Sequence, residues 1–280
     1  MRVRLDLVFS DYVLEVGNGM PPNTVDETIK IPNRMLIPYY DDSTSLDYLI
    51  EDVFHNIHEY SVNISIMMNQ AILTPNNSYV DEINALLIHR LPGEIQRYYS
   101  FDEIIDTSKQ SVMEDFLNTL IPNRLLPHEL LLKKNCPIML LRNINLSEGL
   151  CNRTCLICWA FDQNVIDAEI AVGHYIGKSV FIPRIPFLPN VDENSSFPFK
   201  RTQFPIRLSF AMTINKSQGQ TLDCVGIYLP QPAFSHGQFY VTLSRAKTSS
   251  VVRILIQPVS TEQYEKNYTK NIMFIELLTL

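Results

Sequence analysis

The spacing of hydrophobic and polar positions changes twice along the chain. In the first part, Leu46–Phe54 has apolar residues at helical intervals, which predicts an amphipathic helix. Ala71–Pro75 reads as a buried strand that ends at a proline, and Asn76 or Asn77 can cap the helix that follows. The inner face of that helix would carry Val80, Ile83 and Leu87. A strand, a turn and a helix in this order are characteristic of α/β domains.

From residue 138 the pattern is that of short strands separated by Asn, Gly and Asp turns. Ile166, Ala168 and Ile170 alternate with Asp167 and Glu169, which is the period of a half-exposed strand. The expected strands are Ile138–Leu141, Thr154–Phe161, Val165–Val172 and Ser179–Ile182. Strands so closely spaced predict a small β-barrel.

Residues 188–201 read as a connection, after which the α/β pattern returns. The elements expected there are strand Ile206–Met212, strand Val225–Leu229, helix His236–Ala246 and strand Val251–Ile256. The simplest organisation is an α/β domain that begins near residue 70, is interrupted by a β insertion, and resumes near residue 202. We expect residues 72–74, 206–212, 225–229 and 251–256 to share one sheet.

Composition places the chain among ordinary globular proteins, because 46% of its 280 residues are hydrophobic and 19% are charged. No apolar run approaches the roughly 18–20 residues that a membrane helix needs. The apolar stretch near the first residue is interrupted by Asp6 and is short for a signal peptide. We therefore expect neither a membrane span nor secretion.

The net charge of −7 conceals an asymmetry along the chain. Residues 1–132 carry 8 Lys and Arg against 20 Asp and Glu, whereas residues 133–258 carry 13 against 7. A basic excess confined to the second part favours an anionic partner for that part, and nucleic acid is the commonest such partner.

The five cysteines, an odd number, suit reduced thiols better than a disulfide framework. Cys136, Cys151, Cys155 and Cys158 are close enough in sequence to raise a zinc alternative. However, Cys155 and Cys158 lie three apart on an expected strand, so their side chains would point to opposite faces. We expect buried thiols and no structural metal, with a zinc-bearing β module as the weaker alternative.

One segment resembles a phosphate-binding loop only superficially. Gly173-His-Tyr-Ile-Gly-Lys-Ser179 has three residues between its glycines, where the phosphate loop has four. A phosphate loop must also open a helix, whereas Ser179 leads into a predicted strand. We expect no nucleotide at this segment.

The segment richest in candidate chemistry is Phe210–Asp223, a strand followed by a polar turn. Turns at the carboxyl ends of strands are where α/β sheets bind ligands. Lys216 and the hydroxyls of Thr213 and Ser217 can contact phosphate, and Gly219 allows close approach of the backbone.

A second candidate segment is Tyr240–Lys247, which places Arg245 near the end of a short predicted helix. From there an arginine can reach a γ-phosphate as an arginine finger, although a surface ion pair is the ordinary alternative for a lone arginine. Ser235 and His236 are neighbours in sequence, but no nucleophile elbow surrounds them, and we expect no hydrolase chemistry from the pair.

These segments resemble helicase motifs. Thr213-Ile-Asn-Lys-Ser-Gln-Gly-Gln-Thr-Leu-Asp and Tyr240-Val-Thr-Leu-Ser-Arg-Ala are similar to the fifth and sixth motifs of the petite-integration-frequency (Pif-type) DNA helicases, most of all the plant and Helitron-like group. Ile72-Leu-Thr-Pro-Asn-Asn is similar to the fourth motif. Pro127–Asn145, Gly149-Leu-Cys-Asn and Val180-Phe-Ile-Pro-Arg-Ile resemble the inserted β-barrel.

The resemblance implies the fold class: α/β, with a RecA-like second motor domain of the P-loop NTPase type interrupted by a small β-barrel. The implied boundaries are 1–69 for the end of the first motor domain and a linker, 70–126 and 202–258 for the two parts of the second RecA-like domain, 127–201 for the barrel and connection, and 259–280 for a C-terminal tail.

The resemblance also implies a function: an ATP-dependent helicase that moves five-prime to three-prime on single-stranded DNA, in DNA repair, recombination or replication-type maintenance. ATP and Mg²⁺ would be held mainly by the first motor domain, with Arg245 as the arginine finger and Gln218 and Gly219 as the coupling residues. The implied DNA-contact residues are Thr74, Asn76, Thr213, Asn215, Lys216 and Ser217. The implied location is the nucleus, with the mitochondrion as the alternative.

Two departures from the family pattern keep a second reading open. Arg153 and Cys155 stand where the family usually has a glycine and an arginine, which puts a barrel contact with DNA in doubt. Neither the phosphate loop (Walker A) nor the acidic metal-binding motif (Walker B) occurs in these residues, so we expect no ATP hydrolysis by this chain alone. The chain is therefore expected to be the C-terminal portion of a helicase or, alternatively, a non-catalytic module that binds single-stranded DNA or a protein.

Overall fold

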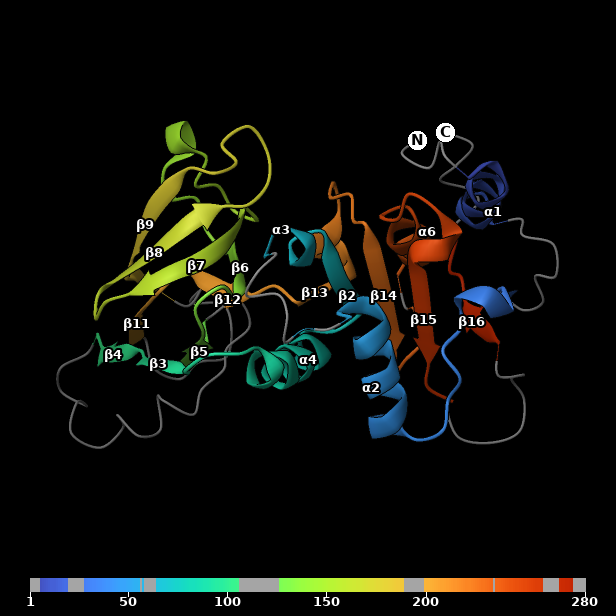
Figure 1. The fold of residues 1–280 in the computed structure, drawn as a ribbon, viewed down its shortest axis with the longest axis horizontal. Coiled ribbons are helices and arrows are strands. Elements are labelled where there is room, and N and C mark those ends of the chain that lie inside the picture. The colour runs from blue at the N-terminus through green and yellow to red at the C-terminus, as the bar shows by residue number, and fades with distance from the viewer. Residues whose placement is uncertain are drawn as a thin grey trace. The chain divides into compact units, whose positions relative to one another are not determined.

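The computed structural model of the protein describes residues 6–19, 28–55, 57, 64–105, 126–188, 199–233, 235–258 and 267–273. They belong to two compact units (Figure 1). One unit comprises residues 1–87 and 210–280, and the other comprises residues 88–209. Within the described ranges, no helix combines the length and the apolar character needed to cross a membrane.

The first unit is built on a four-stranded parallel sheet. Its strand order is β13-β2-β14-β15, so strands from both ends of the sequence pair side by side. The bounds are β2 Gln70–Thr74, β13 Ala211–Thr213, β14 Cys224–Leu229 and β15 Val252–Ile256. Nearly every residue of β2, β13 and β14 is buried, as expected for parallel strands covered on both faces. This is the α/β arrangement that the sequence predicts.

Helix α2 (Asp42–Val53) packs directly against this sheet at Gly226 of β14. A Cβ atom added to Gly226 would lie 2.7 Å from Val53 Cγ2 and 2.9 Å from Ile72 Cγ1, so only glycine fits there. The helix begins where the Asp41 carboxylate accepts the N–H of Thr44 at 2.8 Å. The predicted helix at residues 46–54 is therefore confirmed, with its start at Asp42.

Helix α4 (Asn77–Arg90) buries Val80, Ile83 and Leu87, as the sequence predicts. One polar residue, Asn84, shares that buried face. Its side-chain Nδ2 donates to Ala211 O at 3.2 Å, and its Oδ1 accepts from Ala211 N at 2.9 Å. The three-residue edge strand β13 is thus held by β2 on one side and by the Asn84 amide.

Helix α1 (Leu7–Gly17) joins the same unit and is anchored at its first turn. Asp6 accepts from the N–H of Phe9 at 3.0 Å and from the N–H and hydroxyl of Ser249, at 3.1 and 2.7 Å. These bonds, that from Phe9 foremost, lower the pKa of Asp6 below its ordinary value. At the other end of α1, Gly17 packs on the ring of Tyr240.

The remaining elements of the first unit are short. They are β1 Thr28–Lys30, η1 Asn33–Met35, α3 Ile64–Met67, η5 Ile214–Ser217, α6 Gln238–Leu243, η6 Ser249–Val251 and β16 Tyr268–Lys270. Strands β1 and β16 pair antiparallel. The predicted helix at 236–246 is shorter than expected, because it begins after Gly237, whose φ is +64°, and ends at Leu243.

Beyond the end of α4, the described residues of the second unit form strands and short helical turns. A five-stranded antiparallel sheet has the order β12-β6-β7-β8-β9, a three-stranded sheet has the order β10-β11-β4, and β3 pairs with β5. The five-stranded sheet consists of β6 Pro137–Leu140, β7 Cys155–Phe161, β8 Val165–Ile170, β9 Ser179–Pro183 and β12 Ile206–Leu208. The others are β3 Gln96–Tyr99, β4 Phe101–Ile104, β5 Glu129–Leu132, β10 Ile185–Phe187 and β11 Phe199–Gln203, with the helical turn η4 Leu146–Glu148.

The predicted strands of the β insertion are confirmed, but the described strands do not form one hydrogen-bonded barrel. Prolines stand where one sheet gives way to the next: Pro183 ends β9 just before β10, and Pro205 separates β11 from β12. Proline lacks the N–H that a continuous ladder needs. A closed barrel therefore stays a prediction.

The expectation of one strand over 206–212 is wrong. Residues 206–208 pair with β6 in the second unit, and the backbone N–H of Ser209 donates to Pro137 O at 3.0 Å. Phe210 begins the return to the first unit, where its ring packs edge-on against Phe54 at 5.9 Å. The sequence does not reveal this change, because the two strands are separated by only Ser209 and Phe210, with no glycine or proline turn residue between them.

The compact units do not coincide with the domain boundaries that the resemblance implies, and those boundaries stay predictions. The second unit spans 88–209 rather than 127–201, and α1 and α2 belong to the first unit although residues 1–69 were expected to form a linker and the end of another domain. Residues 1–5, 189–198 and most of 259–280 lie outside the described residues. The origin of residues 1–69 in a first motor domain stays a prediction.

The cysteines are free thiols, and three of the five are buried. Burial, and then the neighbouring Cys136 thiol, raise the pKa of Cys158 above its ordinary value. Among the described residues, no three His, Cys, Asp or Glu side chains converge as metal ligands do.

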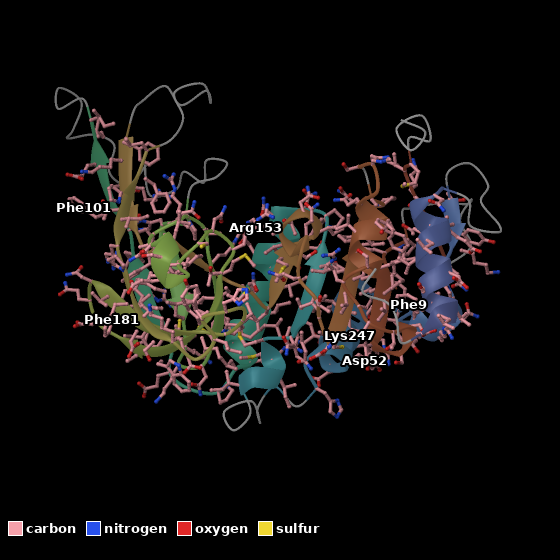
Figure 2. All side chains as sticks on the ribbon, turned by 90° about the horizontal axis from the view of Figure 1, so that it is seen from above. Phe9, Asp52, Phe101, Arg153, Phe181 and Lys247 are labelled. Atoms are coloured by element: carbon pink, nitrogen blue, oxygen red, sulfur yellow. The ribbon has the colours of Figure 1, made fainter. Side chains whose placement is uncertain are left out.

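Arg153, labelled in Figure 2, has a backbone φ of +73°, in the left-handed region that favours glycine. We expect Arg153→Gly to raise the free energy of unfolding by about 0.5–1 kcal/mol, because relief of the left-handed strain exceeds the entropy that glycine adds to the unfolded chain. Urea unfolding measures the change, and Asn152→Gly, at an ordinary φ, should be destabilising. A variant no more stable than the parent would contradict this strain.

Candidate functional site

The predicted DNA-contact residues meet at the carboxyl edge of the parallel sheet. Thr74 ends β2 and Thr213 ends β13, and the two are direct partners in the register of these strands. Both side chains are buried, and Thr74 Oγ1 has no hydrogen-bond partner among the described residues. Asn76, two residues beyond β2, is half-buried. The fold therefore brings these three residues together, with the two hydroxyls beneath the surface.

The helical turn η5 (Ile214–Ser217) follows β13 directly, and its residues differ in solvent exposure. Ile214 is buried in the core, whereas Asn215 is exposed and Lys216 is half-buried. Ser217 is also fully buried, and its hydroxyl donates to Ile214 O at 2.7 Å. Asn215 and Lys216 are thus accessible to a ligand, but the Ser217 hydroxyl is engaged inside the turn.

Gln218 and Gly219, the predicted coupling residues, form the exposed tip of a tight turn. The N–H of Gln220 donates to Ser217 O at 3.0 Å and closes that turn. Gly219 adopts φ +94°, where a larger residue would be strained. A Cβ atom at Gly219 would meet nothing within 4 Å, so the glycine serves the backbone conformation rather than packing.

Arg245, the predicted arginine finger, lies just beyond helix α6 and is only 9% exposed. Its Nη1 donates to Ser217 O at 3.3 Å and to Gln220 O at 3.1 Å, the carbonyls on either side of Gln218 and Gly219. Its Nε donates to Val241 O at 2.9 Å, and Nη2 donates to Ser244 Oγ at 2.7 Å. The structure thus joins the two predicted motifs through one guanidinium.

The backbone also joins these segments. Leu222 N–H donates to Arg245 O at 3.0 Å, and Leu222 pairs with Ala246 in an isolated parallel bridge. On the surface beside this bridge, Lys247 Nζ and Asp223 Oδ1 form an ion pair at 2.5 Å. The turn and the end of α6 therefore form one continuous piece of structure.

The phosphate-loop lookalike at 173–179 behaves as the sequence predicts. It forms turns and leads directly into β9 rather than into a helix. Lys178 pairs with Glu148 at 3.2 Å and lies over the ring of Tyr175, 5.8 Å from its centre. The segment has neither the helix amides nor the free lysine of a phosphate cradle.

Sequence reasoning missed Asn84, which supports the site by fixing Ala211 at the start of β13. It also missed Ser244, whose hydroxyl accepts from Arg245 and donates to Val241 O at 2.8 Å. A signal existed for Asn84, because a lone amide within an otherwise apolar helical stripe needs a buried partner. No comparable signal marks Ser244.

A family model, the 2B domain of the DNA helicase Pif1, matches residues 115–161. The matched residues that the structure describes, 126–161, include β5, β6 and β7 of the second unit. The match therefore falls on the region where the sequence predicts the β insertion.

Curated relatives extend the match to most of the chain. It is 30% identical over 183 residues to the ATP-dependent DNA helicase PIF1 of Homo sapiens and 28% identical over 187 residues to that of Xenopus laevis. These alignments cover 61% and 63% of the chain but only 25% and 26% of the relatives. The chain thus spans about a quarter of the relatives' length.

Solved structures show the same fold. A Pif1 helicase from Candida albicans matches 91% of the chain at a TM-score of 0.59 and 20% identity. A Bacteroides Pif1 helicase in complex with ADP-AlF₃ and single-stranded DNA matches 96% at 0.58 and 21%. The chain covers 55% and 57% of these structures, respectively.

Proposed function

The chain is homologous to the C-terminal region of Pif1-type DNA helicases, and from this premise we propose that it acts as the second RecA-like half of an ATP-dependent DNA helicase. The single observation that carries the proposal is the bonding of Arg245 to Ser217 O and Gln220 O, the carbonyls that flank Gln218 and Gly219, at the carboxyl edge of the parallel sheet. An enzyme that moves on DNA must link a phosphate-sensing group to a DNA-contact surface. Here one guanidinium bonds to the 214–220 turn, in which Asn215 is exposed and Lys216 is half-buried.

The residues present fit one side of a nucleotide. The Arg245 guanidinium and the exposed backbone at Gln218 and Gly219 offer donors to a γ-phosphate, and ATP when bound supplies the phosphoryl group for hydrolysis. Carboxylates for Mg²⁺ are scarce here, because Asp223 is the sole acidic residue of 201–258 and it pairs with Lys247. We therefore assign the phosphate cradle and the Mg²⁺ ligands to a first motor domain and the charge-stabilising arginine to this chain.

The proposed DNA surface consists of Asn76, Asn215 and Lys216. They lie at the ends of neighbouring strands and keep accessible side chains. Thr74, Thr213 and Ser217 support this surface from beneath, and their hydroxyls would reach DNA only after a local opening. The partner is single-stranded DNA, and the direction of movement is five-prime to three-prime by family resemblance.

Lys216→Ala is expected to weaken the binding of single-stranded DNA and to flatten its salt dependence by about one phosphate contact. Fluorescence anisotropy of a labelled oligothymidine, titrated with the 280-residue chain at several salt concentrations, measures both quantities. Lys178→Ala is the matched control, because Lys178 is ion-paired in the other unit. Equal affinity at low and high salt would exclude a phosphate-contact mechanism.

A second candidate function is a non-catalytic module that binds single-stranded DNA or a protein. The observation that favours it is the absence of a Gly-x-x-x-x-Gly-Lys-Ser/Thr motif and an acidic metal-binding motif from the 280 residues. DNA binding is compatible with both functions, but the two differ in whether the gene product includes a first motor domain. A transcript that encodes a phosphate loop upstream of Met1 would decide for the helicase.

The finer assignments follow from the resemblance. We propose the plant and Helitron-like group within the family, because the motifs at 213–223 and 240–246 resemble that group most. DNA repair, recombination or replication-type maintenance and a nuclear or mitochondrial location are proposed on the same basis.

A further inference from the structure

Arg245 is fully engaged with its own unit in this structure. The side chain is 9% exposed, and it donates to two carbonyls of the 217–220 turn and to a carbonyl and a hydroxyl at the end of α6. A guanidinium donates in a fixed planar fork, so its direction is set when several donors are occupied. In this arrangement the group holds the turn rather than pointing at a ligand.

The two carbonyls that accept hydrogen bonds from Arg245 determine the shape of the turn. Ser217 O and Gln220 O lie on either side of Gln218 and Gly219, and Ser217 O also accepts the N–H of Gln220. Gly219 contributes φ +94° and no side-chain packing of its own. The turn therefore depends on backbone bonds and on the cation, and hydrogen bonds to a charged group are the stronger kind.

We propose that Arg245 is the positioning residue of the 214–220 turn when no nucleotide is bound, in addition to its role toward phosphate. The two Nη1 hydrogens cannot serve both carbonyls and a phosphate oxygen, so a phosphate that binds Nη1 releases the turn. The inference rests on the proposed function for its consequence on DNA, because Asn215 and Lys216 lie in the turn that is released. The positioning role itself requires only the contacts above.

Hydrogen exchange of the 280-residue chain tests the positioning role without nucleotide or DNA. Mass spectrometry of peptides covering 214–222 reports on two bonded amides, Gln220 N–H to Ser217 O and Leu222 N–H to Arg245 O. In Arg245→Ala these amides should exchange about tenfold faster or more, the scale expected for the loss of charge-assisted bonds. Arg245→Lys should give an intermediate rate, because one ammonium cannot bridge the carbonyls as a fork does.

Arg253→Ala is the matched control. Arg253 also donates to two backbone carbonyls, of Ser250 and Val252, and pairs with Asp52, and none of these partners belongs to 214–220. Its loss should leave exchange of the 214–222 peptide unchanged. Thermal melting distinguishes local loosening from unfolding, and Arg245→Lys keeps the test valid if Arg245→Ala fails to fold.

Equal exchange of 214–222 in the parent, Arg245→Ala and Arg245→Lys would overturn the positioning role. Anisotropy with oligothymidine separates this inference from the proposed function. A parent chain that fails to bind oligothymidine overturns the proposed function, while faster exchange in the variants still supports the positioning role. If the parent binds, Arg245→Ala should bind severalfold more weakly without nucleotide, which a group acting solely on phosphate would not cause.

Discussion

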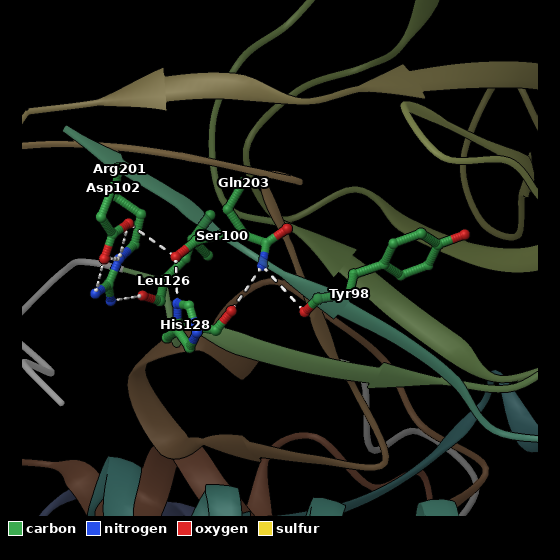
Figure 3. Close-up of polar contacts among 7 residues, drawn as sticks. All are labelled: Tyr98, Ser100, Asp102, Leu126, His128, Arg201 and Gln203. Atoms are coloured by element: carbon green, nitrogen blue, oxygen red, sulfur yellow. Dashed lines mark hydrogen bonds and ion pairs between the residues drawn. The ribbon is translucent and has the colours of Figure 1, made fainter. Parts of the chain in front are cut away.

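Arg201→Met is expected to lower the free energy of unfolding of the second unit by about 3–5 kcal/mol, because it leaves the buried carboxylate of Asp102 without its positive partner. Arg201 is completely buried, and its Nε and Nη2 bind Asp102 at 2.7–3.1 Å, while Nη1 donates to Leu126 O at 2.7 Å (Figure 3). The Asp102 side chain is also buried, and it accepts a hydrogen bond from the Ser100 hydroxyl at 2.8 Å. Urea unfolding followed by Trp159 fluorescence measures the loss in this unit.

Arg97→Ala is the control for this prediction. Arg97 pairs with Glu129 at 2.6 Å, but both side chains are about half exposed, so the expected loss is below about 1 kcal/mol. The double variant Arg201→Met with Asp102→Leu should recover part of the stability, since it removes both buried charges. If Arg201→Met and Arg97→Ala lower the free energy of unfolding by the same amount, the buried pair does not stabilise the unit as described.

Arg245→Ala is expected to reduce DNA-stimulated ATP hydrolysis about 10³–10⁵-fold in a protein that joins an intact first motor domain to this chain. Loss of an arginine finger has this effect because phosphoryl transfer depends on positioning and charge stabilisation. The 280-residue chain alone is expected to release no phosphate above background, since it would supply the arginine without the cradle. Phosphate release with and without single-stranded DNA measures both.

Lys178→Ala provides the control in both proteins and should change neither rate, because Lys178 is paired with Glu148 and precedes a strand. Robust turnover by the 280-residue chain that is abolished by Lys178→Ala would show that residues 173–179 bind nucleotide after all. Full activity of Arg245→Ala in the longer protein would remove Arg245 from the chemistry.

Local patterns of the sequence predicted several helices and strands of both units well. The apolar strand ending at Pro75, the helix with Val80, Ile83 and Leu87 inside, and the alternation at 165–170 each follow from a short-range periodicity that the structure confirms. The juxtaposition of Thr74 and Thr213 also follows, because carboxyl ends of parallel strands meet at one edge of a sheet.

Long-range and directional features could not be predicted in the same way. Asp102 and Arg201 are 99 residues apart, and nothing in either neighbourhood marks a buried pair. Residues 206–212 are divided between the two units because 206–208 pair with β6 and 211–213 pair with β2. The local pattern of strand-forming residues does not specify either partner. The sequence indicated Ser217 and Arg245 as ligand contacts. The fold shows that the Ser217 hydroxyl bonds to Ile214 O within the 214–220 turn and that Arg245 bonds to Ser217 O of the same turn.

The most direct test of the central claim is the hydrogen-exchange footprint of oligothymidine on the 280-residue chain. DNA that binds at the carboxyl edge of the parallel sheet should slow exchange at residues 74–77 and 213–220 together, more at low salt than at high salt. Strand β15, which β14 separates from β2 in the same sheet, should not change. Protection confined to other segments, with 74–77 and 213–220 unaffected at saturating DNA, would contradict the proposed interface.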